Sequence, residues 1–249
     1  MRHDDLAFRQ RRRRFSIVLL VCLCVVGYGL FHSLESNQAA DEPTIQPSVL
    51  SQRINSGEYT RAIEALGQLA VAQRVSHKGY DRSKFSLDWA NYEGCDMRNR
   101  ILQRDLSEVQ LAEDNCTVLR GTLEAGPYSG KNIVFERGVG TSGAIHIEHI
   151  VAVSDAWQKG GQDLSADKRH QFYNDPLNLI AVDGSTNQDK GGKDASAWLP
   201  QKSYHCQYVA RQIAVKLRYS LWVSPPEHQA MQRQLQGCPL QVLPVQASE

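Results

Sequence analysis

The sequence has almost no net charge, because its 28 Lys and Arg residues and 27 Asp and Glu residues leave a formal charge of +1 at pH 7. Binding to a polyanion over a whole surface needs many neutralising charges, so this balance argues against a general polyanion binder. The sequence contains no evident internal repeat, which argues against a solenoid. No two cysteines have Cys-x-x-Cys spacing, which argues against a zinc knuckle.

The chain length and composition are those of a soluble globular protein. With 249 residues, 41% of them hydrophobic and 22% charged, the chain predicts one domain with a sizeable core and room for a small extra lobe. The charge is unevenly distributed. Residues 1–14 contain six arginines and two aspartates, which gives +4, so the remaining 235 residues carry −3. The positive charge is therefore concentrated at the N-terminus, and the rest of the chain is slightly acidic.

A targeting segment is predicted at the N-terminus. Residues 1–14 form a basic cytoplasmic region, and residues 15–31 form an apolar run interrupted only by one serine and two glycines. Such a pattern is typical of a secretory signal or of an uncleaved membrane anchor. No good small-x-small cleavage site follows, which favours the anchor. Residues 32–57 are polar and predict a linker, so residues 58–249 are expected to be exported, either anchored at the extracellular face of the cytoplasmic membrane or secreted.

Six cysteines divide between the two parts of the chain. Two lie inside the apolar run, and four lie in the part expected to be exported, namely Cys95, Cys116, Cys206 and Cys238. Four cysteines allow three pairings, of which Cys95 with Cys116 and Cys206 with Cys238 is the simplest because it closes two local loops. Disulfides and export agree with each other, since both require an oxidising compartment.

The pattern of apolar residues predicts an α+β domain with short strands and flanking helices. Strands are expected over 116–123, 133–135, 144–153 and 178–182, the first two as a small β-meander. Helices are expected over 58–70, 97–106, 164–172, 204–221 and 227–235, with Pro225 and Pro226 ending the fourth. A short helix capped by Ser185 or Thr186 follows the last strand. The centre of the domain is therefore expected to run strand, long insertion, strand, helix.

Four residues of this central stretch have side chains suited to hydrolysing a phosphodiester bond: Glu148, His149, Asn178 and Asn187. On a strand, Glu148 and His149 point to opposite faces, so they can act separately. The carboxylate can hold a metal ion, and the imidazole, which titrates near neutral pH, can act as general base. Asn178 can accept a hydrogen bond from His149 and orient its ring, and Asn187 can be the second metal ligand.

The same stretch suggests the kind of metal ion and a third catalytic group. Carboxylate and amide oxygens are hard ligands, which predicts Mg²⁺, with Mn²⁺ or Ca²⁺ as alternatives, rather than zinc. Lys190 lies three residues after Asn187, on the same face of the expected helix. We expect its ammonium to stabilise the pentacovalent phosphate or the leaving group.

Other basic residues are candidates for contact with substrate. Arg98 belongs to a group of arginines on the helix expected at 97–106, which is either a phosphate-binding patch or a solvated, salt-bridged face. Arg169 and His170 either contact phosphate or brace the insertion. His146 shares a strand face with Glu148 and is either a supporting ligand or a surface or second-shell residue.

The ordered combination of these residues resembles the HNH endonuclease superfamily, which has a ββα-metal fold. Further positions resemble an exported bacterial branch that is related to the C-terminal nuclease domain of modification-dependent restriction enzymes, and the resemblance covers about residues 75–240. These positions are Tyr80-Asp81-Arg82, Cys95-Asp96, Arg98-Asn99, Ala156-Trp157, Arg169, Phe172, Asn174 to Leu179, Lys190-Gly191, Trp198-Leu199-Pro200, and Tyr204 and Cys206 with Cys238.

The resemblance implies a ββα-metal core over residues 144–200, stabilised by disulfides and flanked by helices. It implies that Glu148 and Asn187 are the metal ligands, His149 the general base and Asn178 the residue that orients it. Many members have His or Asp at the first ligand position and His at the second, so Glu148 and Asn187 argue against a two-histidine zinc site. The implied protein is a monomeric endonuclease that acts on DNA, ahead of RNA, with one divalent cation and no organic cofactor.

Two other functions fit parts of the sequence. A non-catalytic exported module on an HNH scaffold is the main alternative, but such a module is expected to lose at least one of the four site positions, and all four are filled. A peptidase or other envelope hydrolase lacks a convincing nucleophile or zinc ligand set. The fragment His146-x-Glu148-His149 does not have the helical histidine spacing of zinc proteases.

Overall fold

The computed structural model of the protein describes residues 60–244. The basic region 1–14, the apolar run 15–31 and the linker 32–57 lie outside these residues, so those predictions stay predictions. Within residues 60–244, no helix is both long and apolar enough to cross a bilayer.

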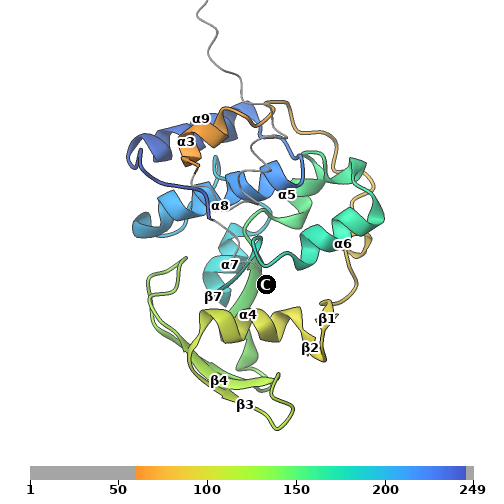
Figure 1. The fold of residues 1–249 in the computed structure, drawn as a ribbon, viewed down its shortest axis with the longest axis vertical. Helices are drawn as coiled ribbons and strands as arrows, with labels where there is room; N and C mark the ends of the chain where they lie inside the picture. Colours follow the sequence, from red (N-terminus) through yellow and green to blue (C-terminus); the bar gives the residue numbers. More distant parts are fainter. Residues whose placement is uncertain (1–59, 245–249) are drawn as a thin grey trace, which may run out of the picture. The chain divides into compact units, whose positions relative to one another are not determined.

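A strand–strand–helix unit forms the centre of the domain (Figure 1). Strand β6 (Ile145–His149) pairs antiparallel with β7 (Leu179–Asp183), with His149 opposite Leu179 and Ile145 opposite Asp183. Helix α7 (Gly184–Lys190) follows β7 directly. Its cap is Asp183, whose carboxylate accepts a hydrogen bond from the Thr186 amide at 2.8 Å, and not Ser185 or Thr186 as the sequence suggested. The order expected from the sequence is confirmed, although β6 is shorter than predicted and β7 is shifted by one residue toward the C-terminus.

Apolar side chains cover both faces of the β6–β7 ribbon, which explains why β7 is apolar from Leu179 to Val182. One face contributes Ile145, Ile147, Leu179 and Ala181 to a core shared with helix α4 (Met97–Asp105) and a three-stranded sheet. The other face contributes Ile180 and Val182 to a larger core built on α8 (His205–Arg218). Figure 1 shows α8, α9 (Pro225–Gln236) and α3 (Ala62–Leu66) on one side of the ribbon, and α4 with the sheet on the other.

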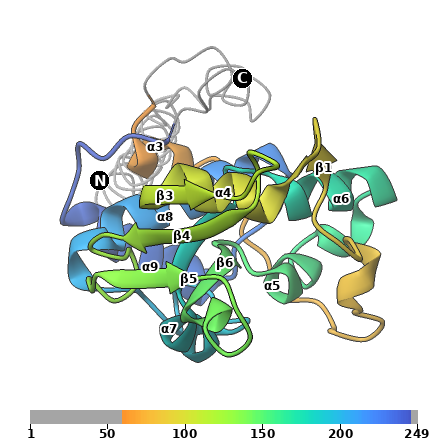
Figure 2. The ribbon, with the colours of Figure 1, turned by 90° about the horizontal axis from the view of Figure 1, so that it is seen from below.

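The three-stranded sheet has the order β3-β4-β5 and is antiparallel, as seen from below in Figure 2. The predicted hairpin is confirmed as β4 (Val118–Leu123) and β5 (Ile133–Glu136). Strand β3 (Ser107–Leu111) was not predicted. Its sequence is largely polar, and its pairing with β4 shifts register twice, so it lacks the regular alternation that identifies a strand.

The remaining elements are short. They comprise strands β1 (Asn91–Tyr92) and β2 (Cys95–Asp96), helices α5 (Val153–Trp157) and α6 (Ala166–Asn174), and 3-10 turns at Arg82–Lys84, Ser142–Ala144, Gly161–Asp163 and Lys202–Tyr204. Both α5 and α6 lie in the insertion between β6 and β7. The two disulfides join Cys95 to Cys116 and Cys206 to Cys238, which confirms the simplest pairing.

Most helix boundaries differ from the sequence prediction by a few residues, and two of the differences change how the chain is read. Helix α3 ends at Leu66 instead of Ala70, and the chain then runs extended to form a bridge between Val71 and Val223. Pro225 and Pro226 begin α9 instead of ending α8, which stops at Arg218. Ser224 caps α9 in a capping box with Glu227, and proline is well tolerated in the first turn of a helix.

A buried charge network joins α5, α8, α9 and the loop after α7. The Lys159 ammonium lies 2.8 Å from Asp155, 2.7 Å from Asp194 and 2.5 Å from Glu227. Lys216 contacts Glu227 at 3.0 Å, and Arg74 contacts Asp194 at 2.6 Å. Two buried lysines and Arg74, which reaches in from the surface, therefore balance three carboxylates, so that each buried charge is paired.

Candidate active site

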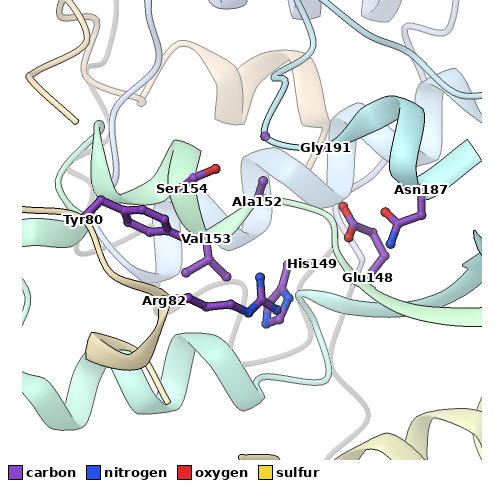
Figure 3. A pocket seen from close by; sticks show the side chains of 10 residues that line it. Tyr80, Arg82, Glu148, His149, Ala152, Val153, Ser154, Asn187 and Gly191 are labelled. Carbon is purple, nitrogen blue, oxygen red and sulfur yellow. The ribbon is translucent and has the colours of Figure 1, made fainter. Parts of the chain in front are cut away.

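A pocket of about 260 Å³ opens where three distant segments of the chain meet (Figure 3). Its polar lining consists of Tyr80, Arg82, Glu148, His149, Ser154 and Asn187. The volume of one water molecule in the liquid is about 30 Å³, so the pocket has room for a phosphodiester group and several waters. Glu148, the predicted metal ligand, and His149, the predicted general base, both line it.

The β6 backbone places Glu148 and His149 in different surroundings. Alternation along the strand turns Glu148 toward α7, where it pairs with Lys190. The His149 ring instead stacks between aromatic rings, 5.8 Å from Trp89 and 6.4 Å from Phe172. The expectation that the two side chains lie on opposite faces of the strand is confirmed.

The hydrogen bond of His149 determines which ring nitrogen carries the proton. Nε2 lies 2.8 Å from the backbone oxygen of Tyr173. A carbonyl oxygen only accepts, so Nε2 is the donor and Nδ1 of the neutral ring keeps its lone pair. Nδ1 has no hydrogen-bond partner within residues 60–244. Burial, with the nearby charge of Arg82 acting in the same direction, lowers the pKa of His149 to about 3, so the ring is uncharged at neutral pH.

Asn178 does not hold the His149 ring as the sequence suggested. Its Oδ1 accepts a hydrogen bond from the Val151 amide at 2.9 Å, and its backbone oxygen accepts one from the Ile150 amide at 2.8 Å. Asn178 is fully buried, and its hydrogen bonds join the end of the insertion between β6 and β7 to the beginning of that insertion. It therefore fixes the backbone that follows His149, and the ring itself is oriented by the Tyr173 oxygen.

Helix α7 brings Asn187 and Lys190 against β6. The Asn187 Nδ2 atom lies 3.3 Å from Nδ1 of His146, which leaves the amide oxygen turned away from His146. Lys190 is fully buried, pairs with the Glu148 carboxylate and donates to the His149 backbone oxygen at 3.3 Å. This position does not match the expected contact with phosphate. Lys190 instead positions Glu148 and the strand end that carries the base.

A glycine permits the close approach of α7 to its neighbours. A Cβ atom built on Gly184 would overlap the backbone oxygen of Gly143 and lie 3.0 Å from Nε2 of His146. Backbone cannot give way as a flexible side chain does, so the first position of α7 requires glycine. The helix that carries Asn187 is placed by this contact.

Three residues expected to contact substrate lie outside the pocket lining. Arg169 donates to the backbone oxygens of Lys84 at 3.0 Å and Leu164 at 2.6 Å, which are contacts that brace the insertion. His170 is exposed on α6 and lies 3.4 Å from the Asn174 amide. Arg98 is half-buried and reaches the backbone oxygen of Ile145 at 3.5 Å.

Sequence reasoning gave no role to Arg82 or Trp89. Arg82 lines the pocket, and Trp89 covers one face of the His149 ring. Both lie more than fifty residues before the central motif, so spacing could not connect them with it. The available signal was the concentration of aromatic and charged residues between Gly79 and Trp89.

The oxygen donors of the pocket fit a hard divalent cation that is only partly held by protein. Figure 3 shows the Glu148 carboxylate and the Asn187 amide pointing toward one another. Lys190 engages Oε1 of Glu148, and Oε2 has no partner within the described residues. Within residues 60–244, no group of three or more His, Cys, Asp or Glu side chains could form a metal cage. One carboxylate and one amide suit an ion such as Mg²⁺, which keeps several waters and binds phosphate oxygens.

Comparison with known proteins places this geometry in a family. Residues 96–234 match the model of the C-terminal domain of GmrSD restriction endonucleases. A protein of Arthroderma benhamiae, described as an uncharacterized secreted protein, is 33% identical over 188 residues, which cover 74% of this chain and 88% of that protein. No solved structure matches the chain. The matched segment contains β6, β7 and α7 with Glu148, His149, Asn178, Asn187 and Lys190. The chain therefore belongs to the family of the GmrSD restriction endonuclease C-terminal domain, which is of the HNH type.

Proposed function

We propose that the protein is a metal-dependent endonuclease that hydrolyses phosphodiester bonds of DNA. The observation that carries the proposal is the state of His149. Its Nε2–H is fixed on the Tyr173 oxygen, and its unprotonated Nδ1 belongs to a ring that lines the same pocket as Glu148 and Asn187. A neutral imidazole with one nitrogen held and the other free is the arrangement required of a general base.

In the proposed mechanism, His149 takes the proton from the attacking water at Nδ1. The charge of Arg82 helps to keep the pKa of His149 low, and a phosphate bound in the pocket would offset that charge and make the ring a stronger base. Lys190 and the β6 backbone hold Glu148 in place. A divalent cation held by Glu148 and Asn187 would offset the negative charge that develops on the phosphate.

The test uses the full-length protein with its disulfides intact and supercoiled plasmid DNA. We expect nicking with Mg²⁺ or Mn²⁺, none in EDTA, and a loss of at least about a hundredfold in His149→Ala, the lower range for a general base. His170→Ala is the matched control, because this histidine is exposed and lies away from the pocket. An RNA substrate in parallel determines the nucleic acid. If wild type and His149→Ala were equally inert on both substrates with every metal, a binding module on an HNH scaffold would replace this proposal.

We also propose that the protein is exported and monomeric. The two disulfides suit an oxidising compartment, and the Arthroderma benhamiae relative carries the description of a secreted protein. Whether residues 15–31 are retained as an anchor can be tested by measuring the mass of the mature protein from membrane and soluble fractions. A mature chain that begins after residue 31 would exclude the anchor.

A further inference from the structure

Arg82 is an arginine inside the pocket without an acidic partner. Its guanidinium lines the pocket, and Figure 3 shows its side chain reaching toward the His149 ring. Nε and Nη2 lie 3.3 and 3.2 Å from the hydroxyl of Tyr173, and Cζ lies 5.1 Å from the centre of that ring. Within residues 60–244, no carboxylate pairs with Arg82. Some other arginines of the domain are neutralised by carboxylates, as Arg74 is by Asp194 and Arg218 is by Asp175, whereas Arg169 bonds only to backbone oxygens and does not line the pocket.

The groups that hold Arg82 are neutral. Tyr173 and Tyr80 are its side-chain neighbours, and burial raises the pKa of Tyr80, so that phenol stays protonated at neutral pH. A guanidinium has five N–H donors, and Tyr173 occupies two of them through one oxygen. Arg82 therefore presents an unneutralised charge and free donors to the pocket. A planar fork of this kind binds two oxygens of one phosphate group at once.

Tyr173 serves both Arg82 and the base. Its backbone oxygen accepts the His149 Nε2 proton at 2.8 Å, and its hydroxyl meets the Arg82 guanidinium. The residue is buried near the end of α6 and packs in the main core, so both of its contacts start from a fixed point. The two ends of Tyr173 thus set the distance between His149 and Arg82.

We propose that Arg82 binds the phosphate to be cleaved and that the Tyr173 hydroxyl positions it, which deepens and rests on the proposed nuclease function. Glu148 and Asn187 would hold the cation on one side of His149, and Arg82 would bind the phosphate anion on the other side. A phosphodiester spanning the pocket then has its charge met at both ends. Arg82 lies outside residues 96–234, so the match to the family does not assign this role.

The test separates binding from cleavage. Full-length wild type, Arg82→Gln, Arg82→Lys and Tyr173→Phe are compared by fluorescence anisotropy with a short fluorescein-labelled DNA duplex in EDTA, over a range of salt concentrations. We expect Arg82→Gln to weaken binding roughly tenfold and to reduce the slope of log K against log salt by about one, as the loss of one phosphate contact should. Arg82→Lys keeps the charge without the fork and should restore the slope but only part of the affinity. Arg233→Gln, an exposed arginine of α9, is the control.

Tyr173→Phe removes only the hydroxyl and leaves the backbone oxygen that fixes His149. We expect it to reproduce part of the Arg82→Gln loss in binding and to add nothing in the double variant, because both act on one contact. A purely structural role would give additive losses and a lower thermal midpoint. Unchanged affinity and salt slope in folded Arg82→Gln would overturn the inference. If wild type binds DNA through Arg82 but never cleaves it, the nuclease proposal fails and the binding role of Arg82 survives.

Discussion

Lys159→Met should strongly destabilise the domain, because Lys159 is the centre of the buried charge network. Its side chain is fully buried, and its ammonium contacts three carboxylates at 2.5 to 2.8 Å. Methionine has a similar length and apolar stem, so the substitution removes the charge without opening a large cavity. Asp155, Asp194 and Glu227 would then share only Lys216 and Arg74.

The size of the effect follows from the burial. Removing one partner of a buried ion pair costs about 3–5 kcal/mol, because the remaining charge has neither water nor a counter-ion. We expect about 4 kcal/mol for Lys159→Met, a large part of the roughly 5–15 kcal/mol that stabilises a typical domain. For a domain of this size, that loss lowers the thermal midpoint by about 8–16 °C.

The assay is urea unfolding of the full-length protein at pH 7 with both disulfides intact. Lys168→Met is the control, because this lysine is exposed on α6, and its change should stay within about 0.5 kcal/mol. The difference between wild type and Lys159→Met should shrink below pH 4, where protonation of the carboxylates removes the unpaired charge. A loss under about 1 kcal/mol at pH 7 with an unchanged m-value would refute the argument that this lysine neutralises the core.

Four further predictions follow from other contacts. Burial alone would raise the pKa of Asp194, but Lys159, Ser196 and Arg74 outweigh it and hold the pKa well below its usual range. This carboxylate therefore stabilises the domain fully above about pH 4, and the stabilisation is lost as the pH falls further. Midpoints of urea unfolding measured at decreasing pH would show this loss. Gly184→Ala should cost about 1–3 kcal/mol through overlap with the Gly143 backbone, whereas Gly140→Ser, whose Cβ would meet open space, should cost less in the same unfolding assay even though its positive φ adds some strain. Replacing Cys206 and Cys238 together by serine opens a loop of 32 residues and should cost roughly 3–4 kcal/mol, measured against the same protein with the disulfide intact. Asn187→Ala should raise the Mg²⁺ concentration needed for half-maximal nicking about tenfold or more, and an unchanged metal dependence would remove Asn187 from the ligand set.

The central unit was predictable because its signals are local. The apolar run around Glu148 and His149, the proline before Leu177 and the helix carrying Asn187 each follow from residues close in sequence. The two disulfides were also predictable, since local loops are the simplest pairing. Strand β3 was not, because its polar residues and shifted register leave no periodic pattern, and it exists through pairing with β4.

The gathering of three candidate residues in one pocket was predictable from the sequence, but their contacts were not. Glu148, His149 and Asn187 meet in one pocket, but the partner of His149 is a backbone oxygen of Tyr173, and a sequence pattern does not reveal backbone acceptors. Lys190 was assigned to substrate because it lies on the same helical face as Asn187, and only the packing of α7 against β6 shows that it is buried. Arg82 could not be placed, since nothing local connects it with a strand more than sixty residues later.

The hydrogen bonds of Asn178 hold the two ends of the insertion between β6 and β7 together, so the length and sequence of part of the insertion can vary. Its two ends are tied to each other at Ile150, Val151 and Asn178, so the strands stay paired whatever length of chain runs between them. Within that segment, only the short approach from Phe172 to Tyr173 contributes groups that touch the base and the arginine. Ser154 of this segment also lines the pocket, and Asp155 and Lys159 belong to the buried charge network, whereas Gly161 to Ala166 contribute nothing to the pocket lining. A change of length or sequence between Gly161 and Ala166 is therefore expected to leave the pairing of β6 with β7 and the pocket lining in place.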